Sequence, residues 1–447
     1  MRFLAIVAVL CLTLALQATG AIAADPETSP KYTVAVDGKS LTVGATDLGA
    51  YAGFDLRNPV TVHVTVNVDI HSVAVRPTAL EISPIVAGRA LTFRLASPSY
   101  LSIEINGDIA YPLFLFSDPP RTDAPNPVGT GIHYFGPGEH TGDVNLNSDE
   151  TLYLARGAVM KGQINIVGSA QDLKKNVHIL GPGIIDTRSA GNRPVRIRYA
   201  NSVTIDGPTI LNKDAWTLAA YATRDLRILN IKIIASNRYS DGIGIIGSTN
   251  VILDRVFVRS NDDSIAVKSG KPSFGWPYRD VSGVSVSRAV IFNGPYGNGL
   301  EIGYELAGKV HNIQYSDIDI IHKVSDTNPY RRAAVSIHND GNAAVSNINY
   351  QNIRIEDVTE NLFYIGVLNT TEVEDRSVGL GSIGKIAFTN VSVTAPQPVP
   401  SVIEGYDTGH PVRNVMFRGL IYHGVPVKEP QQLGLQTNDH AANVTFG

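Results

Sequence analysis

Cysteine is almost absent from this 447-residue chain, and the single one is Cys11. Cys11 lies in an apolar stretch near the N-terminus, so the rest of the chain has no thiol for a disulfide or a cysteine-ligated metal site. A chain of this length without disulfides gains its stability from the packing of a large core. We expect the protein to use no metal and no cofactor.

Charged residues are also few. Asp, Glu, Lys and Arg make up 17% of the chain, and its formal net charge is −4. The absence of a basic stripe or a polybasic tail argues against a nucleic-acid partner and against binding to anionic lipid. The sequence has neither a Gly-x-Ser-x-Gly motif nor a His-Glu-x-x-His motif, so neither Ser-His-Asp catalysis nor a zinc site is indicated.

Long apolar runs are missing except at the N-terminus. There, Arg2 is followed by an apolar run over residues 3–16 and by a small-residue site at 21–23. This order is typical of a secretory signal peptide, and its run is too short for a membrane span. We expect residues 1–23 to be cleaved off and the mature protein to be secreted, extracellular or periplasmic, without a membrane span.

The first part of the chain alternates between apolar and polar residues. VTVHVTVNVDI, residues 60–70, is apolar at every second position, which is the pattern of a half-buried strand. Similar short segments continue to residue 118, and they predict a small β-sandwich over residues 25–118. SDPPRTDAPNP, residues 117–127, is rich in proline, which cannot donate to a sheet. We therefore place a linker at 119–127 and a second domain at 128–447.

The second domain contains a repeat. Nine segments share apolar first and third positions, a short turn and a second apolar pair, and they start at residues 177, 203, 226, 251, 284, 313, 348, 386 and 415. Such spacing is that of coiled repeats, and no unit has a helical period. Because one coil cannot bury its apolar face alone, successive coils stack about 4.8 Å apart. The sequence predicts an all-β fold, a right-handed parallel β-helix preceded by a small β-sandwich.

Some coils carry a further strand, and aligning these strands brings carboxylates together. The aligned segments are 240–247, 262–270, 298–305 and 333–340. Asp241, Asp263 and Asn298 then share one column, and Asp262 lies at the bend just before its strand. Since neighbouring coils are in register, three carboxylates are expected to meet on one side of the β-helix.

Carboxylates gathered in this way supply acid–base chemistry. Like charges raise one another's pKa, which leaves one carboxyl protonated beside an ionised one near neutral pH. Glycoside cleavage with inversion uses such a pair about 6.5–9.5 Å apart, the scale of one or two coil spacings. The alternative is structural, because Asp-Gly and Asn-Asp are favoured turn residues. We assign Asp206 to a turn on that ground, and Asp241, Asp262 and Asp263 to a catalytic site.

Other residues are candidates for contact with a sugar. Glu301 falls in an outward column beside the cluster, where it has a catalytic or substrate-contact role or only faces outward from the strand. Lys268 and His338 share a third column, where they bind sugar hydroxyls or an acidic substituent, or only solvate the face. The ring of Tyr304 either stacks on a sugar or packs a loop. Trp216 is included because of the resemblance described below. Together with Asn298, these residues form the predicted substrate-binding set.

The chain resembles the polygalacturonase family of pectin-degrading glycoside hydrolases, best over about residues 175–345. Tyr-Ser-Asp-Gly at 239–242 is similar to the family's Asn-Thr-Asp motif, and Asn-Asp-Asp at 261–263 is similar to its Asp-Asp pair one coil later. NKDAWTLAAY, residues 212–221, resembles the family's coil that bears a tryptophan. The resemblance implies a polysaccharide substrate, Asp262 as general acid, and Asp241 and Asp263 as the groups that activate water.

Two motifs depart from that family. Its Gly-His-Gly is Gly-Asn-Gly here at 297–299, and its Arg-Ile-Lys is Ser-Ile-His at 336–338. The missing basic residues are those with which the family holds the uronate carboxylate. In these places the chain is more similar to the dextranase and isopullulanase family, which has three aspartates on a β-helix, an N-terminal β-sandwich and neutral α-glucan substrates. An acidic and a neutral substrate both stay open.

The leading hypothesis is a secreted, inverting glycoside hydrolase that acts on a polysaccharide. One alternative is a polysaccharide lyase, with Lys268 as proton abstractor and calcium held by the carboxylates. The other is a non-catalytic, carbohydrate-binding β-helix that has lost its basic residues. The three hypotheses differ in their products. A hydrolase releases new reducing ends, a lyase releases an unsaturated sugar, and a binding protein releases no product.

Overall fold

The computed structural model describes residues 28–189, 193–325, 331–370, 376–396 and 399–447. The predicted signal peptide, residues 1–23, lies outside the described residues. Across the described ranges the chain has β-strands and no α-helix, and its four 3₁₀ segments are η1 (Thr78–Leu80), η2 (Pro272–Phe274), η3 (Arg376–Val378) and η4 (Pro430–Leu433). No helix in this part of the chain has the length and hydropathy of a membrane span.

The first ten strands form two five-stranded sheets, ordered β2-β1-β5-β8-β7 and β3-β4-β10-β9-β6. Their bounds are β1 Tyr32–Val36, β2 Lys39–Leu41, β3 Gly44–Thr46, β4 Gly49–Asp55, β5 Val60–Val66, β6 Val73–Arg76, β7 Ile85–Ala87, β8 Ala90–Leu95, β9 Tyr100–Ile105 and β10 Leu113–Asp118. In β5, Val62, Val64 and Val66 are buried and the residues between them are exposed, as the alternation predicts. The inward side chains of both sheets form one apolar core, which makes the pair a β-sandwich.

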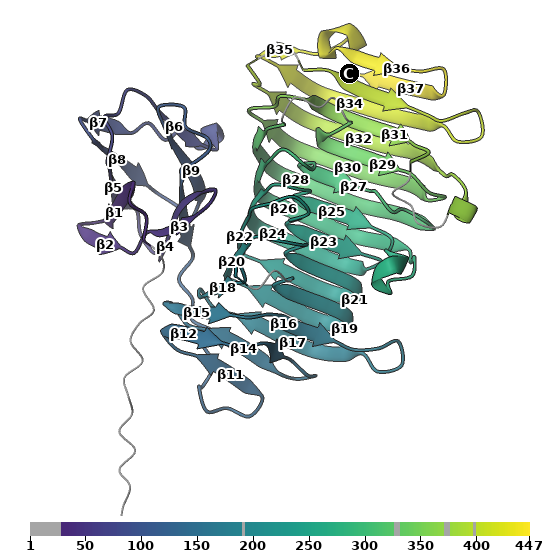
Figure 1. The fold of residues 1–447 in the computed structure, drawn as a ribbon. Helices are drawn as coiled ribbons and strands as arrows, with labels where there is room; N and C mark the ends of the chain where they lie inside the picture. The colour runs from purple at the N-terminus through teal and green to yellow at the C-terminus, as the bar shows by residue number, and fades with distance from the viewer. Residues whose placement is uncertain (1–27, 190–192, 326–330, 371–375, 397–398) are drawn as a thin grey trace, which may run out of the picture.

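The strands from β11 onward wind into a right-handed parallel β-helix (Figure 1). Its first strands are β11 Ile132–Phe135, β12 Gly138–Thr141, β13 Val144–Asn145, β14 Thr151–Leu154, β15 Ala158–Lys161, β16 Ile164–Val167, β17 Lys174–Leu180, β18 Ile184–Asp186, β19 Val195–Asp206, β20 Thr209–Asn212, β21 Leu218–Leu229 and β22 Lys232–Ala235. The next are β23 Ile243–Ile246, β24 Thr249–Ser260, β25 Ile265–Lys268, β26 Val281–Asn293, β27 Leu300–Ile302, β28 Lys309–Lys323, β29 Ala333–Asn339 and β30 Ala344–Ile355. The last are β31 Asn361–Val367, β32 Ser382–Val393, β33 Ser401–Glu404, β34 Val412–Tyr422, β35 Val425–Pro426, β36 Leu435–Thr437 and β37 Ala441–Phe446. The predicted fold class is confirmed.

All nine predicted repeats stack in register. Their first residues pair from coil to coil in one unbroken column: Val177, Val203, Leu226, Val251, Val284, Ile313, Ile348, Ile386 and Val415. Every side chain in this column is buried in the central core. The apolar repeat in the sequence is therefore the core of the β-helix.

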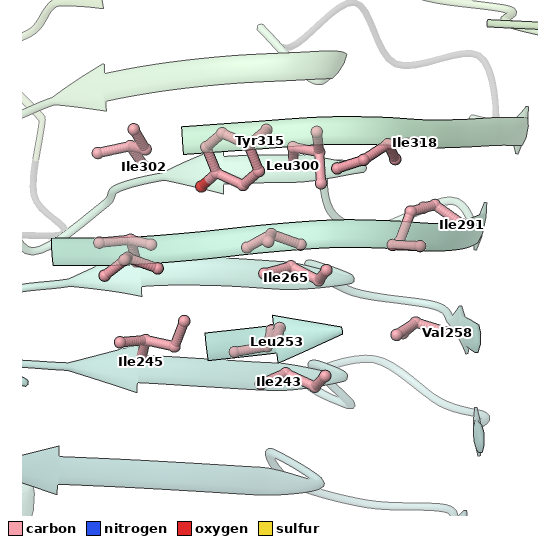
Figure 2. Close-up of a cluster of buried hydrophobic side chains, with 14 of the residues drawn as sticks. Ile243, Ile245, Leu253, Val258, Ile265, Ile291, Leu300, Ile302, Tyr315 and Ile318 are labelled. Carbon is pink, nitrogen blue, oxygen red and sulfur yellow. The ribbon is translucent and has the colours of Figure 1, made fainter. Parts of the chain in front are cut away.

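A complete coil has three strand segments, and β23 with β24 is an example. β23 forms one face, and β24 forms the other two, because it bends at Arg255, where φ is 52°. β23 pairs with β25, and both halves of β24 pair with β26, so each face continues along the stack. Figure 2 shows the interior between the faces, with Ile243, Ile265 and Leu300 on one side and Leu253 and Tyr315 opposite them.

The sandwich lies against the side of the middle coils (Figure 1). Its Phe114 and Phe116 pack on Phe257, with ring centroids 5.1 and 5.0 Å apart, and Phe114 also contacts Phe292 at 6.2 Å. Phe257 and Phe292 belong to the third segments of their coils, so the sandwich covers that face. The row of turns that follows this face, leading into β23, β25 and β27, carries the predicted aspartates.

Candidate active site

Backbone hydrogen bonds align the three turns that carry the polar cluster. Gly242 N donates to Asp263 O at 2.8 Å, and Ser264 N donates to Asn298 O at 2.8 Å. Asp241, Asp263 and Asn298 therefore occupy equivalent positions on successive coils. The structure brings together the column that the sequence alignment predicted, and Asp262 precedes it at the bend.

Gly297 allows the third turn to approach the aspartate pair. A Cβ atom at this position would lie 2.1 Å from Asp263 N and 2.3 Å from the carbonyl carbon of Asp262. Real Cβ contacts are never this short, so only glycine fits. The Gly-Asn-Gly segment thereby places Asn298 directly against Asp263.

Hydrogen bonds hold the aspartate pair in place. Asp262 accepts from its neighbour Asp263 N at 2.9 Å and from Tyr239 N at 3.1 Å. Asp263 Oδ1 accepts from both the backbone N and Nδ2 of Asn298, each at 2.9 Å. Asn298 Oδ1 in turn accepts from Ala333 N at 2.9 Å. Asn298, predicted to bind substrate, thus uses its amide to orient Asp263.

The three aspartates line a cavity of about 560 Å³. Seven of the nine predicted site residues contribute to its wall, and these are Trp216, Asp241, Asp262, Asp263, Lys268, Asn298 and Tyr304. The other two, Glu301 and His338, lie beneath the wall. A cavity of this volume is in the range that holds small ligands.

Burial and mutual repulsion disfavour ionisation of all three carboxyls. Burial is the largest cause of the raised pKa of Asp241, and the charges of Asp262 and Asp263 add to it. Burial also raises the pKa of Asp262, against the opposing effect of Lys268. The pKa of Asp263 is raised by burial to about 7. The cluster therefore retains at least one proton near neutral pH, beside carboxylates that ionise.

Lys268 is a buried cation next to the cluster. Its Nζ donates to Glu305 Oε2 and to Gly303 O, both at 2.9 Å, and lies 3.6 Å from Asp263 Oδ2. It also lies over the ring of Trp216, 5.5 Å from the centroid. Lys268 is thus committed to protein groups, and its nearest effect is electrostatic, on the aspartates.

Glu301 and His338 are placed differently from the sequence expectation. They occupy the outward columns that the alignment gave, but they are only 0% and 1% exposed. His338 Nδ1 lies 2.9 Å from Glu301 Oε1, and the ring of Tyr304 stacks on the imidazole at 4.4 Å. Both side chains point outward from their strands, but they are not exposed to solvent. Tyr304, in the turn after β27, covers them.

Three arginines in the cavity wall were not predicted from the sequence, and these are Arg193, Arg238 and Arg332. Arg193 lies over the ring of Phe274 at 4.5 Å, and its buried Nε has no hydrogen-bond partner. Arg332 Nη1 donates to Pro295 O at 2.5 Å. Within the described ranges, none of these guanidiniums forms an ion pair with a carboxylate, unlike Arg331 beside Glu404 or Arg354 beside Asp319.

The position of these arginines explains why they were missed. Arg193 precedes β19, Arg238 directly precedes the Tyr-Ser-Asp-Gly turn, and Arg332 directly precedes β29. All three lie outside the strands on which the coils were aligned. A search of the residues flanking each aligned strand would have found Arg238 and Arg332.

No group of three or more His, Cys, Asp or Glu residues is arranged to hold a metal ion in the described part of the chain. The aspartate cluster is accompanied instead by cations of the protein itself. Lys268 is one, and Lys271, 2.5 Å from Glu305 Oε1, is another.

Comparison with solved structures supports the fold. Dex49A from Penicillium minioluteum aligns with a TM-score of 0.64 and 16% identity, covering 94% of each chain. A hyperthermoactive exopolygalacturonase from Thermotoga maritima aligns with a TM-score of 0.50 and 15% identity, covering 71% of this chain and 84% of the other. At these identities, the similarity concerns the fold alone.

Comparison of sequences identifies the family. A probable polygalacturonase from Vitis vinifera is 29% identical over 133 residues, which is 29% of this chain and only 27% of that relative's length. The model of glycosyl hydrolases family 28 matches residues 160–428. That range is more than half of the chain and includes every coil that contributes an aspartate. The chain belongs to glycosyl hydrolases family 28.

Proposed function

We propose that this protein is a secreted glycoside hydrolase that cleaves a uronate-containing polysaccharide with inversion at the anomeric carbon. One observation carries the proposal: a cavity of about 560 Å³ combines three crowded carboxyls with three guanidiniums that have no carboxylate partner among the described residues. The carboxyls supply the chemistry, and the guanidiniums select the substrate. The signal-like N-terminal sequence supports secretion.

In the proposed reaction, Asp262 is the general acid. Asp241 and Asp263 are only 3% and 6% exposed, whereas Asp262 is partly exposed to the cavity. A glycosidic oxygen of a bulky polymer therefore reaches Asp262 more easily than the other two. Asp262 gives its proton to this oxygen as the bond from the anomeric carbon to the leaving sugar breaks.

Asp241 and Asp263 activate the water in this proposal. A water molecule is small enough to lie deeper in the cavity, between these two carboxyls. One of them, ionised, takes a proton from the water as the water oxygen bonds to the anomeric carbon. The acid ends deprotonated and the base protonated, and exchange with solvent restores both. Attack from the face opposite to the leaving group gives inversion.

The three arginines support an acidic substrate. Arg193 and Arg332 are partly buried. A partly desolvated guanidinium that lacks a carboxylate costs free energy in the empty cavity, and a bound carboxylate restores its pairing. Arginine also binds carboxylates through two parallel hydrogen bonds. Arg193, Arg238 and Arg332 would thus take over the role of the basic residues that are absent at 297–299 and 336–338. The likeness to Dex49A does not oppose this, since it concerns the fold.

The charge of Lys268 favours hydrolysis over a lyase reaction. Burial alone would lower its pKa, but Glu305, Asp263 and Asp241 outweigh burial and raise the pKa well above the usual value. A lysine that stays charged is a poor proton abstractor. The cluster around Lys268 therefore fits an electrostatic role.

The test is a product assay with the mature protein on polygalacturonate, rhamnogalacturonan, dextran, pullulan and arabinan. We expect new reducing ends from a uronate-containing polymer and, by NMR, an inverted anomer as first product. Hydrolysis of dextran or pullulan alone would refute the acidic substrate but not the hydrolase. An unsaturated, ultraviolet-absorbing product would establish the lyase instead. Mass spectrometry of protein from culture fluid tests secretion and cleavage near residue 23.

A further inference from the structure

A fully buried ion pair beneath the cavity has no role in the reaction proposed above. Glu301 projects from β27 and His338 from β29, one coil later. His338 Nδ1 lies 2.9 and 3.0 Å from the two carboxylate oxygens of Glu301, and Ser336 donates to the same carboxylate. On the other side of the ring, His338 Nε2 lies 2.9 Å from Arg331 O.

The surroundings of His338 favour its charged form. With Glu301 as a carboxylate, both ring nitrogens of His338 face oxygens that only accept hydrogen bonds, because the second partner is the backbone carbonyl of Arg331. A neutral imidazole has a single N–H and satisfies one of them, whereas the imidazolium satisfies both. Consistently, burial alone would lower the pKa of His338, but the charge of Glu301 and the hydrogen bonds to Glu301 and Arg331 together raise it. The geometry and the raised pKa both favour an imidazolium at His338.

The imidazolium is stacked between two tyrosines. The ring of Tyr304 lies 4.4 Å away at an interplanar angle of 13°, and that of Tyr364 lies 4.8 Å away at 20°. The hydroxyl of Tyr364 is hydrogen-bonded to Glu404, away from the aspartates. Tyr304, in contrast, lines the catalytic cavity. A cation held flat against an aromatic face attracts the ring, so His338 fixes the plane of Tyr304.

The pair occurs at one level of the stack, next to the cavity. In register with Glu301, the preceding coil has Ala266 and the following coil has Ser336. In register with His338, the following coil has Gly366. Burying an ion pair is seldom better for stability than burying well-packed apolar residues. The neighbouring coils have small neutral residues at these positions. Stability alone therefore does not account for the charged pair Glu301 and His338.

We propose that Glu301 and His338 are positioning residues that hold Tyr304, and that Tyr304 forms the wall against which the sugar bound beside Asp263 rests. Tyr304 is partly exposed to the cavity, and it follows β27, whose preceding turn carries Asn298, the hydrogen-bond donor to Asp263. A sugar ring that rests on a tyrosine face is aligned by it. This inference rests on the proposed hydrolase function.

The test is a double-mutant cycle in steady-state kinetics on the polysaccharide that the mature protein hydrolyses. We expect Tyr304→Ala to raise KM about three- to tenfold, with kcat changed by less than about twofold. His338→Gln should raise KM by a smaller factor. In the Tyr304→Ala background, His338→Gln should add nothing, because the ring it positions is gone.

Controls separate positioning from stability. Phe388→Leu disturbs a core stack in which Phe388 contacts Tyr350 and Phe417 at 4.6 and 4.8 Å, and it should lower the melting temperature without raising KM. If His338→Gln does not fold, the Glu301→Gln/His338→Gln variant, which removes both charges, takes its place in the cycle.

Two results would overturn the inference: additive effects of the two substitutions on KM, or a lower melting temperature in His338→Gln with an unchanged KM. A wild-type protein that hydrolyses none of the five polysaccharides would instead refute the proposed function. That result is obtained before any variant is made, so the two failures are distinguishable.

Discussion

Two groups of charged side chains in this protein are built in opposite ways. Where the sandwich meets the coils, His322 and Arg76 each lie between two carboxylates. His322 contacts Glu104 at 2.7 Å and Asp357 at 2.8 Å, and Arg76 contacts the same Glu104 at 3.1 Å and Glu356 at 2.5 Å. In the cavity, by contrast, three carboxyls crowd one another while three guanidiniums lack a carboxylate among the described residues.

Under the proposed function, the difference separates charges that serve the fold from charges that serve a ligand. Pairing offsets the cost of removing an ion from water, so the interface charges are compensated without any further molecule. The cavity charges are compensated only in part, and the pKa values of the three aspartates stay raised. Substitutions in the two groups should therefore affect different quantities, stability at the interface and catalysis in the cavity.

The substitution Asp262→Asn should have the largest effect and tests the cavity group. The amide keeps the shape of the side chain but cannot give up a proton as an acid. We expect kcat to fall by about 10²- to 10⁴-fold in a reducing-end assay, with no loss of thermal stability, because one of the mutually repelling charges is removed. Asp206→Asn is the matched control, since Asp206 accepts from Asn230 at 2.7 Å and pairs with Arg121 at 3.0 Å. If Asp206→Asn reduces kcat as strongly as Asp262→Asn, the assignment of Asp262 as general acid is wrong.

Glu104→Gln tests the interface. This change leaves the buried His322 and the partly buried Arg76 with one carboxylate each. It should cost about 3–5 kcal/mol of unfolding free energy, the usual range for a broken buried pair. Denaturant melting measures the loss, and kcat of the folded fraction at low temperature should be unchanged. Asp69→Asn at the exposed pair with Arg89 is the control and should leave the midpoint unchanged. A loss of kcat without a loss of stability would show that the interface serves catalysis.

The fold was predictable because its signal is local and periodic. The column from Val177 to Val415 recurs in nine successive coils, and its register follows from stacking. The same register placed Asp241, Asp263 and Asn298 together. The site was predictable as far as its residues lie on the repeated strands or, like Asp262, directly precede one.

What was not predictable depends on contacts between distant or irregular segments. His322 and Glu104 are separated by 218 residues, and nothing in either neighbourhood marks the partner. The burial of Glu301 and His338 depends on Tyr304, which lies in a turn and not in a repeated strand. Arg193 reaches the cavity from an irregular segment before β19. The sequence repeat predicts which residues share a column of the β-helix, but it does not predict which side chains cover that column.

Arg332→Met tests whether the unpaired guanidiniums bind the substrate. We expect KM for the uronate-containing polymer to rise roughly tenfold or more, since hydrogen bonds between charged groups are worth about 1.5–3 kcal/mol. The KM of Arg332→Lys should lie between those of the wild type and Arg332→Met, because lysine keeps the charge but loses the bidentate geometry. Added salt should raise the wild-type KM more than that of Arg332→Met. Equal KM values for wild type and both variants would leave the acidic substrate without support from this residue.

The smallest expected effect is a displacement of the pH profile by Lys268→Met. Lys268 lowers the pKa of Asp241, Asp262 and Asp263, against the larger effect of burial. Without this cation, the three pKa values rise further. The base then needs a higher pH to ionise, and the acid keeps its proton to a higher pH, so both limbs of kcat/KM against pH move upward. Lys271→Met removes the other partner of Glu305 and should leave the profile in place. A profile that moves downward in Lys268→Met would show that Lys268 does not lower the pKa values of the aspartates. Equal upward shifts in both variants would show that the effect is not specific to Lys268.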